Sequence, residues 1–123
     1  MYRLIIGNKN YSSWSLRAWL LLKEFQIPFE ELRIPLHTDT FKQDILNYSR
    51  AGKVPALVVD ELTVWDSLAI CEYIAESYPE KNCWPVQPEA RAIARSVSNE
   101  MHSGFAGIRS QLPMNCRKQV EIK

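Results

Sequence analysis

The sequence predicts an α/β unit followed by the first part of an all-helical region. Short apolar runs alternate with segments of helical apolar spacing over residues 1–80, and a proline-rich stretch follows them. The rest of the chain carries one long apolar stripe at helical spacing. The 123 residues include 46% hydrophobic and 24% charged residues, which is typical of a globular protein.

The start of the chain predicts a strand, a helix and a second strand. Residues 2–6 are apolar and aromatic and stop at a Gly-Asn turn signal. From Ser12 or Ser13 to about Phe25, apolar residues fall near helical spacing, and serines are available as N-caps. An Ile-Pro step ends this helix, and residues 29–34 predict the second strand. Together they indicate a βαβ unit with a right-handed crossover.

The next elements are a weak helix, a hairpin and a second long helix. Residues 38–48 have a sparse apolar face and predict the weak helix. A Gly-Lys-Val-Pro break leads to a short strand at 56–59, and an Asp-Glu turn leads to another at 62–65. An Asp-Ser pair at 66–67 starts a helix that continues to Pro79. The order βαβ, helix, ββ, helix makes residues 1–80 one α/β domain.

Prolines mark residues 81–88 as a linker, and one continuous helix is predicted beyond it, over 88–112. At 1.5 Å per residue this helix would be roughly 35 Å long. Its apolar residues recur in steps of three or four: Ile93, Val97, Met101, Phe105, Ile108 and Leu112. One helix cannot bury such a stripe by itself. Either it packs on the α/β unit and a partner subunit or, as we expect, residues 89–123 begin a truncated all-helical domain.

Composition excludes several classes of protein. Lys plus Arg is 15 and Asp plus Glu is 14, so the chain lacks the basic excess of a nucleic-acid binder. The longest apolar run, at 18–22, is far too short to cross a membrane, and no signal-peptide cleavage pattern is present. Three cysteines without close pairing or metal-ligand spacing argue against a disulfide scaffold and a metal site, and favour the reduced cytoplasm.

Ser12 and Ser13 lie at the predicted N-terminus of the first helix, directly after the first strand. Free backbone N–H groups and the positive end of the helix dipole favour an anion there. A serine hydroxyl at this point can donate a hydrogen bond to a thiolate and lower the pKa of the thiol. The simpler interpretation is that both serines only cap the helix.

Two further positions can bind polar parts of a ligand. Val54 precedes Pro55, and a cis proline would expose the Val54 backbone to a peptide-like ligand, whereas a trans proline would simply open the strand. Asp66 can pair with an ammonium group and Ser67 can bind a carboxylate, although both can act only as helix caps. An amino-acid end, an extended peptide and a thiol would fit the three positions together. The tripeptide glutathione has those parts in that order.

Three motifs resemble the N-terminal, thioredoxin-like domain of cytosolic glutathione transferases. They are Ser-Ser-Trp-Ser at 12–15, Lys-Val-Pro-Ala-Leu at 53–57 and Trp-Asp-Ser-Leu-Ala-Ile at 65–70. The predicted helix after the linker resembles the first helix of the family's all-helical domain. The serine turn is similar to the Ser-Ser-Cys-Ser turn of the bacterial-type and zeta-like serine classes. Trp14, however, stands where zeta-like members carry cysteine.

The resemblance implies how glutathione would bind. Ser12 would stabilise the thiolate, with Ser13 as the alternative because the turn offers two adjacent hydroxyls. Val54 would pair through its backbone with the cysteinyl part, directly before the family's cis proline, Pro55. Asp66 and Ser67 would hold the γ-glutamyl end of glutathione, and Lys53 would hold its glycyl carboxylate.

The function implied by the resemblance is conjugation of the glutathione thiolate to small hydrophobic electrophiles, in detoxification, by a homodimer that needs no metal. Three residues would contribute to the acceptor site: Trp14, Met101 and Phe105. Because the chain reaches only the first helix of the helical domain, glutathione binding would persist while transfer is weak. The alternatives are a non-enzymatic interaction module and a zeta-type cis-trans isomerase. A glutaredoxin-type oxidoreductase is disfavoured because its chemistry needs a cysteine at the turn.

Four other residues are expected to be ordinary. His102 lies near the apolar stripe and is expected to be a packed or rim histidine. Arg17 and Arg109 are expected to be solvated or paired surface charges. Cys71 falls on an apolar helix face, which indicates an inert buried thiol.

Overall fold

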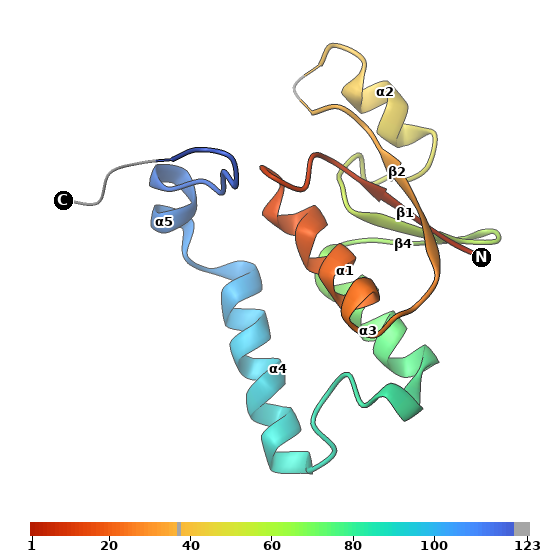
Figure 1. Ribbon diagram of the computed structural model, residues 1–123, viewed down its shortest axis with the longest axis vertical. Helices are drawn as coiled ribbons and strands as arrows, with labels where there is room; N and C mark the ends of the chain where they lie inside the picture. Colours follow the sequence, from red (N-terminus) through yellow and green to blue (C-terminus); the bar gives the residue numbers. More distant parts are fainter. Residues whose placement is uncertain (37, 120–123) are drawn as a thin grey trace.

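The computed structural model describes residues 1–36 and 38–119, and its α/β part confirms the predicted order of elements (Figure 1). Four strands form one sheet in the order β2-β1-β3-β4: β1 (Tyr2–Ile6), β2 (Phe29–Arg33), β3 (Ala56–Val59) and β4 (Leu62–Val64). β1 and β2 are parallel, as a βαβ unit requires, whereas β3 is antiparallel to both β1 and β4.

Helices cover both faces of the sheet, and three of them pack there: α1 (Ser13–Glu24), α2 (Phe41–Leu46) and α3 (Ser67–Ser77). α1 and α3 contact each other on one face, where Leu4 and Ile6 of β1 are fully buried (Figure 1). α2 contributes Ile45 to a second core that contains Ile5 of β1. Because neighbouring residues of a strand point to opposite faces, β1 is buried on both sides.

A short 3-10 helix, η1 (Pro79–Lys81), leads from α3 into the proline-rich segment, and α4 (Pro88–Ser103) begins where the linker was predicted to end. Polar contacts hold the linker and the middle of α4 near α3. The Glu72 carboxylate on α3 accepts hydrogen bonds from Arg95 Nε at 3.2 Å and from Trp84 Nε1 at 3.1 Å. Because α4 lies beside α3, the C-terminal end of α4 lies toward the start of α1 (Figure 1).

The prediction of one continuous helix over 88–112 is wrong. The structure divides it into α4 and a short helix, α5 (Ala106–Gln111). Gly104, a poor helix former, ends α4, and Phe105 adopts a left-handed conformation with φ of 62°. A Cβ on Gly104 would lie 2.8 Å from the Glu100 carbonyl oxygen, so glycine fits this break where larger residues do not.

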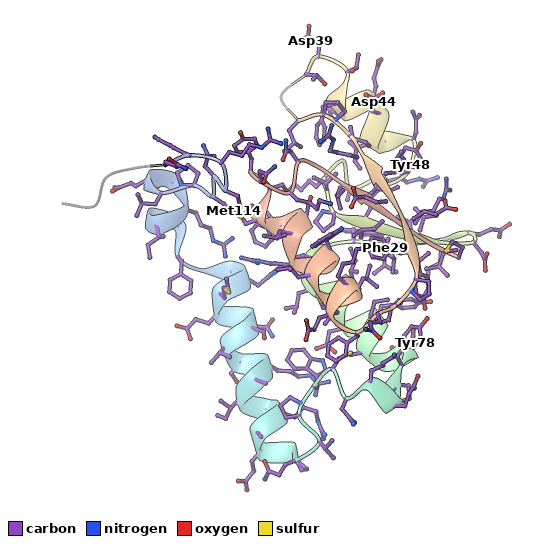
Figure 2. The ribbon with its side chains drawn as sticks, viewed as in Figure 1. Phe29, Asp39, Asp44, Tyr48, Tyr78 and Met114 are labelled. Atoms are coloured by element: carbon purple, nitrogen blue, oxygen red, sulfur yellow. The ribbon has the colours of Figure 1, made fainter. Side chains whose placement is uncertain are left out.

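The break turns the chain back toward the start of α1. The Cys116 N–H donates a hydrogen bond of 3.0 Å to the Asn10 carbonyl, in the loop that follows β1. Met114 accordingly lies beside the beginning of α1 (Figure 2). The apolar stripe of α4 and α5 stays largely uncovered, since its six residues are between 50% and 76% exposed. Within the described residues, no helix combines the length and the apolar character needed to cross a membrane.

Candidate active site

The N-terminus of α1 presents the two serines that were predicted to meet a thiol. Ser12 is the N-cap of α1, because its Oγ accepts a hydrogen bond of 3.3 Å from the Ser15 N–H. Only 9% of Ser12 is exposed, and together with the half-buried Ser13 it lines a cavity between α1 and the α4–α5 segment. The capping interpretation is therefore correct for Ser12. Capping uses a lone pair of the hydroxyl oxygen and leaves its proton free for another partner.

Ser15, which sequence reasoning did not single out, lies behind Ser12. Its side chain is fully buried, and its Oγ is 2.9 Å from the Ser12 Oγ. The backbone N–H of Gly7, at the end of β1, donates a hydrogen bond of 3.0 Å to the same Ser15 oxygen. The Ser-x-x-Ser spacing is the signal that points to this pair, because residues three apart meet on one turn of a helix.

A second cavity gathers the other predicted binding residues from two separate parts of the chain. They are Lys53, Val54, Pro55, Asp66 and Ser67. The Val54–Pro55 peptide bond is cis, as the resemblance implies. Among the described residues, Val54 takes part in no backbone hydrogen bond outside the helices and strands. A ligand lying along this wall can therefore pair with the Val54 backbone.

Asp66 and Ser67 lie at the N-terminus of α3, where helix geometry favours a bound carboxylate. Asp66 caps α3 by accepting a hydrogen bond of 3.1 Å from the Ala69 N–H. Burial tends to raise the pKa of Asp66, but the hydrogen bond from Ala69 and the nearby His102 outweigh it, so this pKa lies below its usual value. The Ser67 hydroxyl is buried and has no hydrogen-bond partner among the described residues. An unpaired buried hydroxyl costs free energy, which a ligand's carboxylate would recover.

Trp14 borders both cavities and so connects the two sites. The first cavity is also lined by Met101 and Phe105, the other residues predicted for the acceptor site. The structure thus brings the three predicted acceptor residues to the cavity that contains Ser12 and Ser13, next to the cavity that contains the predicted glutathione-binding residues.

Comparison with known families shows to which family the chain belongs. The family model described as "Glutathione S-transferase, N-terminal domain" matches residues 11–77, which is more than half of the chain. The chain belongs to the glutathione transferase family. The matched range includes the serine turn, the Val54–Pro55 segment and the Asp66–Ser67 pair, so the fold expected from the resemblance is confirmed.

The alignments with curated relatives include most of this chain but only part of each relative. Maleylacetoacetate isomerase of Rattus norvegicus is 35% identical over 111 residues, which make up 88% of this chain and 49% of the relative. Glutathione S-transferase GstB of Escherichia coli (strain K12) is 31% identical over 97 residues, or 74% of this chain and 45% of the relative. The chain therefore spans about half the length of these curated relatives.

Solved structures agree with the family assignment. A glutathione transferase homologue from Burkholderia GL BGR1, solved with bound glutathione, matches with a TM-score of 0.72 and 28% identity. The match covers 89% of this chain and 57% of that one. A member of this family therefore binds glutathione on the same fold.

His102 of this glutathione transferase family member contacts residues that the sequence did not predict. Its Nε2 lies 3.1 Å from Asp66 Oδ2, and its ring meets Trp14 edge-on with centroids 5.0 Å apart. The expectation of a packed or rim histidine is right about its half-buried state but misses its position at the wall of the second cavity. No local pattern could have found it, because its contact with Asp66 joins residues 36 positions apart.

Arg17 and Arg109, expected to be ordinary surface charges, both contact Trp14. Their guanidinium carbons lie 4.4 Å and 4.5 Å from the centre of the Trp14 ring. Neither forms an ion pair within the described part of the chain. Burial lowers the pKa of Arg17, and the positive charge of Arg109 lowers it further. Two half-buried cations therefore border the cavity that contains Ser12 and Ser13.

The prediction that Cys71 is an inert buried thiol is met only in part, because the residue is partly exposed. It lies on α3 behind Ser67, and burial raises the pKa of its thiol to about 11. A pKa this high keeps most of the thiol protonated at neutral pH, which slows its reaction as a nucleophile. The described residues contain no cluster of three His, Cys, Asp or Glu side chains arranged to hold a metal ion.

Proposed function

We propose that this chain is the glutathione-binding part of an enzyme that conjugates the glutathione thiol to small electrophiles. The observation that carries the proposal is the Asp66–Ser67 pair at the start of α3, which sets a carboxylate beside a buried hydroxyl that has no hydrogen-bond partner in the described part of the chain. This pair complements the charged end of an amino acid, with ammonium at Asp66 and carboxylate at Ser67. In this proposal residues 1–80 form the glutathione-binding domain, residues 81–88 the linker and residues 89–123 the start of the helical domain.

Each part of glutathione then has a partner in one of the two cavities. The γ-glutamyl end binds Asp66 and Ser67, and the peptide between the ends pairs with the Val54 backbone beside Pro55. Lys53, exposed at the rim of the same cavity, binds the glycyl carboxylate. The thiol points toward the neighbouring cavity, where the Ser12 hydroxyl lies at the N-terminus of α1.

The chemistry at Ser12 is electrostatic. No histidine or carboxylate contacts Ser12 among the described residues, so the serine has no base to take its proton. Instead, its hydroxyl donates a hydrogen bond to the thiolate, and the positive end of α1 favours the same negative charge. Both effects lower the pKa of the thiol and raise the fraction of thiolate available for attack on the electrophile. Ser13 offers the second hydroxyl of the same turn.

The acceptor site includes Trp14, Met101 and Phe105, which supply an apolar wall for a small electrophile. A specific observation keeps the isomerase alternative open. Arg17 and Arg109, which form no ion pair within the described residues, place two cations at this wall, which suits an acceptor that carries a carboxylate. Several relatives are named maleylacetoacetate isomerase, and an acetoacetate group carries a carboxylate. Trp14 stands where zeta-like members carry cysteine, and this difference counts against the isomerase reaction for this chain.

We further propose a homodimer in a reduced, cytoplasmic setting. The exposed apolar stripe on α4 and α5 requires cover, and three free cysteines suit a reducing compartment. A non-enzymatic interaction module is the remaining alternative. It predicts that Ser12→Ala leaves every measurable property unchanged.

Calorimetric titration of glutathione into the folded chain tests the proposal. We expect saturable binding that Asp66→Asn weakens about tenfold, because asparagine still caps α3 but does not carry the charge that pairs with ammonium. Asp39→Asn is the matched control, since Asp39 lies on the α2 side of the molecule, away from both cavities (Figure 2). Absence of binding by a chain whose circular dichroism shows it folded would overturn the proposal.

A further inference from the structure

Ser15 makes two hydrogen-bond contacts, and because its side chain is buried these contacts limit the direction in which its hydroxyl can donate. The Gly7 N–H donates to the Ser15 oxygen at 3.0 Å, and the Ser12 oxygen lies 2.9 Å away. The Ser15 side chain is completely buried. Water therefore cannot supply a missing hydrogen bond, and each of its hydrogen-bonding groups needs a partner in the protein.

The distance between the two serine oxygens suits a hydrogen bond donated by either hydroxyl, and the two directions have different consequences. If Ser12 donates to Ser15, the Ser15 proton is left without an acceptor among the described residues. A buried donor without an acceptor is costly. If Ser15 donates to Ser12, the Ser15 hydroxyl is satisfied both as donor and as acceptor.

The second direction also determines where the Ser12 proton points. The Ser12 oxygen then accepts from the Ser15 hydroxyl and from the Ser15 N–H, which lies 3.3 Å away. Both lone pairs of Ser12 are occupied, and its proton is directed away from Ser15. The exposed part of Ser12 borders the cavity shared with Ser13 and Trp14, so the proton points there.

We infer that Ser15 is a positioning residue, whose hydroxyl donates to Ser12 and aims the Ser12 proton at the thiol of bound glutathione. The inference rests on the proposed function. The Gly7 N–H, the Ser15 hydroxyl and the Ser12 hydroxyl form a chain of donors that ends on the thiolate. Each bond in such a chain polarises the next, which strengthens the last one. Ser13 has no comparable support, since it makes no side-chain hydrogen bond among the described residues.

The experiment measures the pKa of the thiol in bound glutathione, using the NMR shift of an isotope-labelled cysteinyl β-carbon so that the protein's own thiols do not contribute. Ser15→Ala is expected to raise this pKa by roughly half a unit. The dissociation constant of glutathione at low pH, where the thiol is protonated, is expected to change less than twofold, since the ends of the ligand bind elsewhere. Ser49→Ala is the matched control, because Ser49 is also a buried serine that accepts a backbone hydrogen bond, far from both cavities.

A double substitution separates positioning from packing. Because Ser15 acts through Ser12, adding Ser15→Ala to Ser12→Ala is expected to raise the thiol pKa no further. A purely structural role predicts that Ser15→Ala and Ser49→Ala behave alike. If Ser15→Ala fails to fold, Ser15→Cys keeps a side chain of similar shape with a much weaker donor and is expected to raise the thiol pKa in the same direction.

The outcomes for this inference and for the proposed function are distinct. If wild-type protein binds no glutathione, or binds it without lowering its thiol pKa, the proposed function fails. If wild-type protein lowers the thiol pKa and Ser15→Ala lowers it equally, only the positioning role of Ser15 is overturned. Additive effects of the Ser12 and Ser15 substitutions would also overturn it.

Discussion

His102 Nε2 lies 3.1 Å from Asp66 Oδ2, and this contact ties the far end of α4 to the cap of α3. Asp66 therefore has both carboxylate oxygens engaged, one by the Ala69 N–H and the other by the imidazole. The first helix after the linker thus helps to orient a residue of the proposed glutathione site.

Removing the imidazole is expected to weaken glutathione binding modestly. The pair is partly exposed, so His102→Ala should raise the dissociation constant about two- to fivefold. His102→Gln retains an amide N–H that can donate to Asp66 and should restore much of the affinity. Calorimetric titration of both variants checks this, and equal affinities for wild type and His102→Ala would show that the contact does not orient Asp66.

The depressed pKa of Asp66 predicts a loss of stability in acid. Burial alone raises this pKa, but the Ala69 N–H and His102 lower it below its ordinary value of 3.8, so the folded state favours the ionised carboxylate. This stabilisation is complete above the unfolded-state pKa and disappears as the pH falls through the lower folded-state pKa. Chemical denaturation below about pH 4 should therefore show a steeper loss for wild type than for Asp66→Asn. Parallel pH profiles would contradict the assigned shift.

The break between α4 and α5 predicts opposite effects for two glycines. Gly104→Ala should lower the free energy of unfolding by about 1 kcal/mol, because the new Cβ would lie 2.8 Å from the Glu100 carbonyl oxygen. Gly107→Ala should raise the helix content slightly, since no atom lies within 4 Å of the added methyl and alanine favours a helix by about 1 kcal/mol. Denaturation and circular dichroism measure both effects. Equal behaviour would mean that the helix does not break at Gly104.

Cysteine reactivity should follow burial. Burial raises the pKa of Cys71 to about 11, whereas Cys116 is exposed. Brief alkylation at neutral pH, followed by mass spectrometry of peptides, should modify Cys116 well before Cys71. Preferential modification of Cys71 would contradict the raised pKa of its thiol.

The two arginines beside Trp14 should distinguish acceptors by charge. Arg109→Met is expected to weaken binding of a glutathione conjugate that bears a carboxylate about three- to tenfold, and to leave a neutral conjugate of the same shape almost unaffected. Competition binding with the two conjugates measures the difference. An equal loss of affinity for both conjugates would show that Arg109 acts by packing against Trp14 and not by binding the carboxylate.

Local signals predicted the α/β elements well. The Gly-Asn turn after β1, the serine cap of α1 and the Asp-Ser start of α3 each act over a few residues, and the structure places these elements as predicted. Even the hairpin without glycine formed, because Asp60 accepts a left-handed conformation with φ of 53°.

The features that the sequence did not predict depend on contacts between distant segments of the chain. The apolar stripe continued across Gly104 and Phe105, so spacing alone indicated one helix where the backbone breaks. Motif residues identified the candidate glutathione site, but His102 and Arg109 reach Asp66 and Trp14 only through the placement of α4 and α5. Periodicity carries no information about that placement.

The role of Ser12 in activating glutathione can be measured as the pKa of the thiol in bound glutathione, compared between wild type and Ser12→Ala by NMR titration. We expect wild type to lower this pKa below that of free glutathione, and Ser12→Ala to remove about one unit or more of the shift. A bound thiol that titrates like free glutathione in the wild-type protein would contradict it.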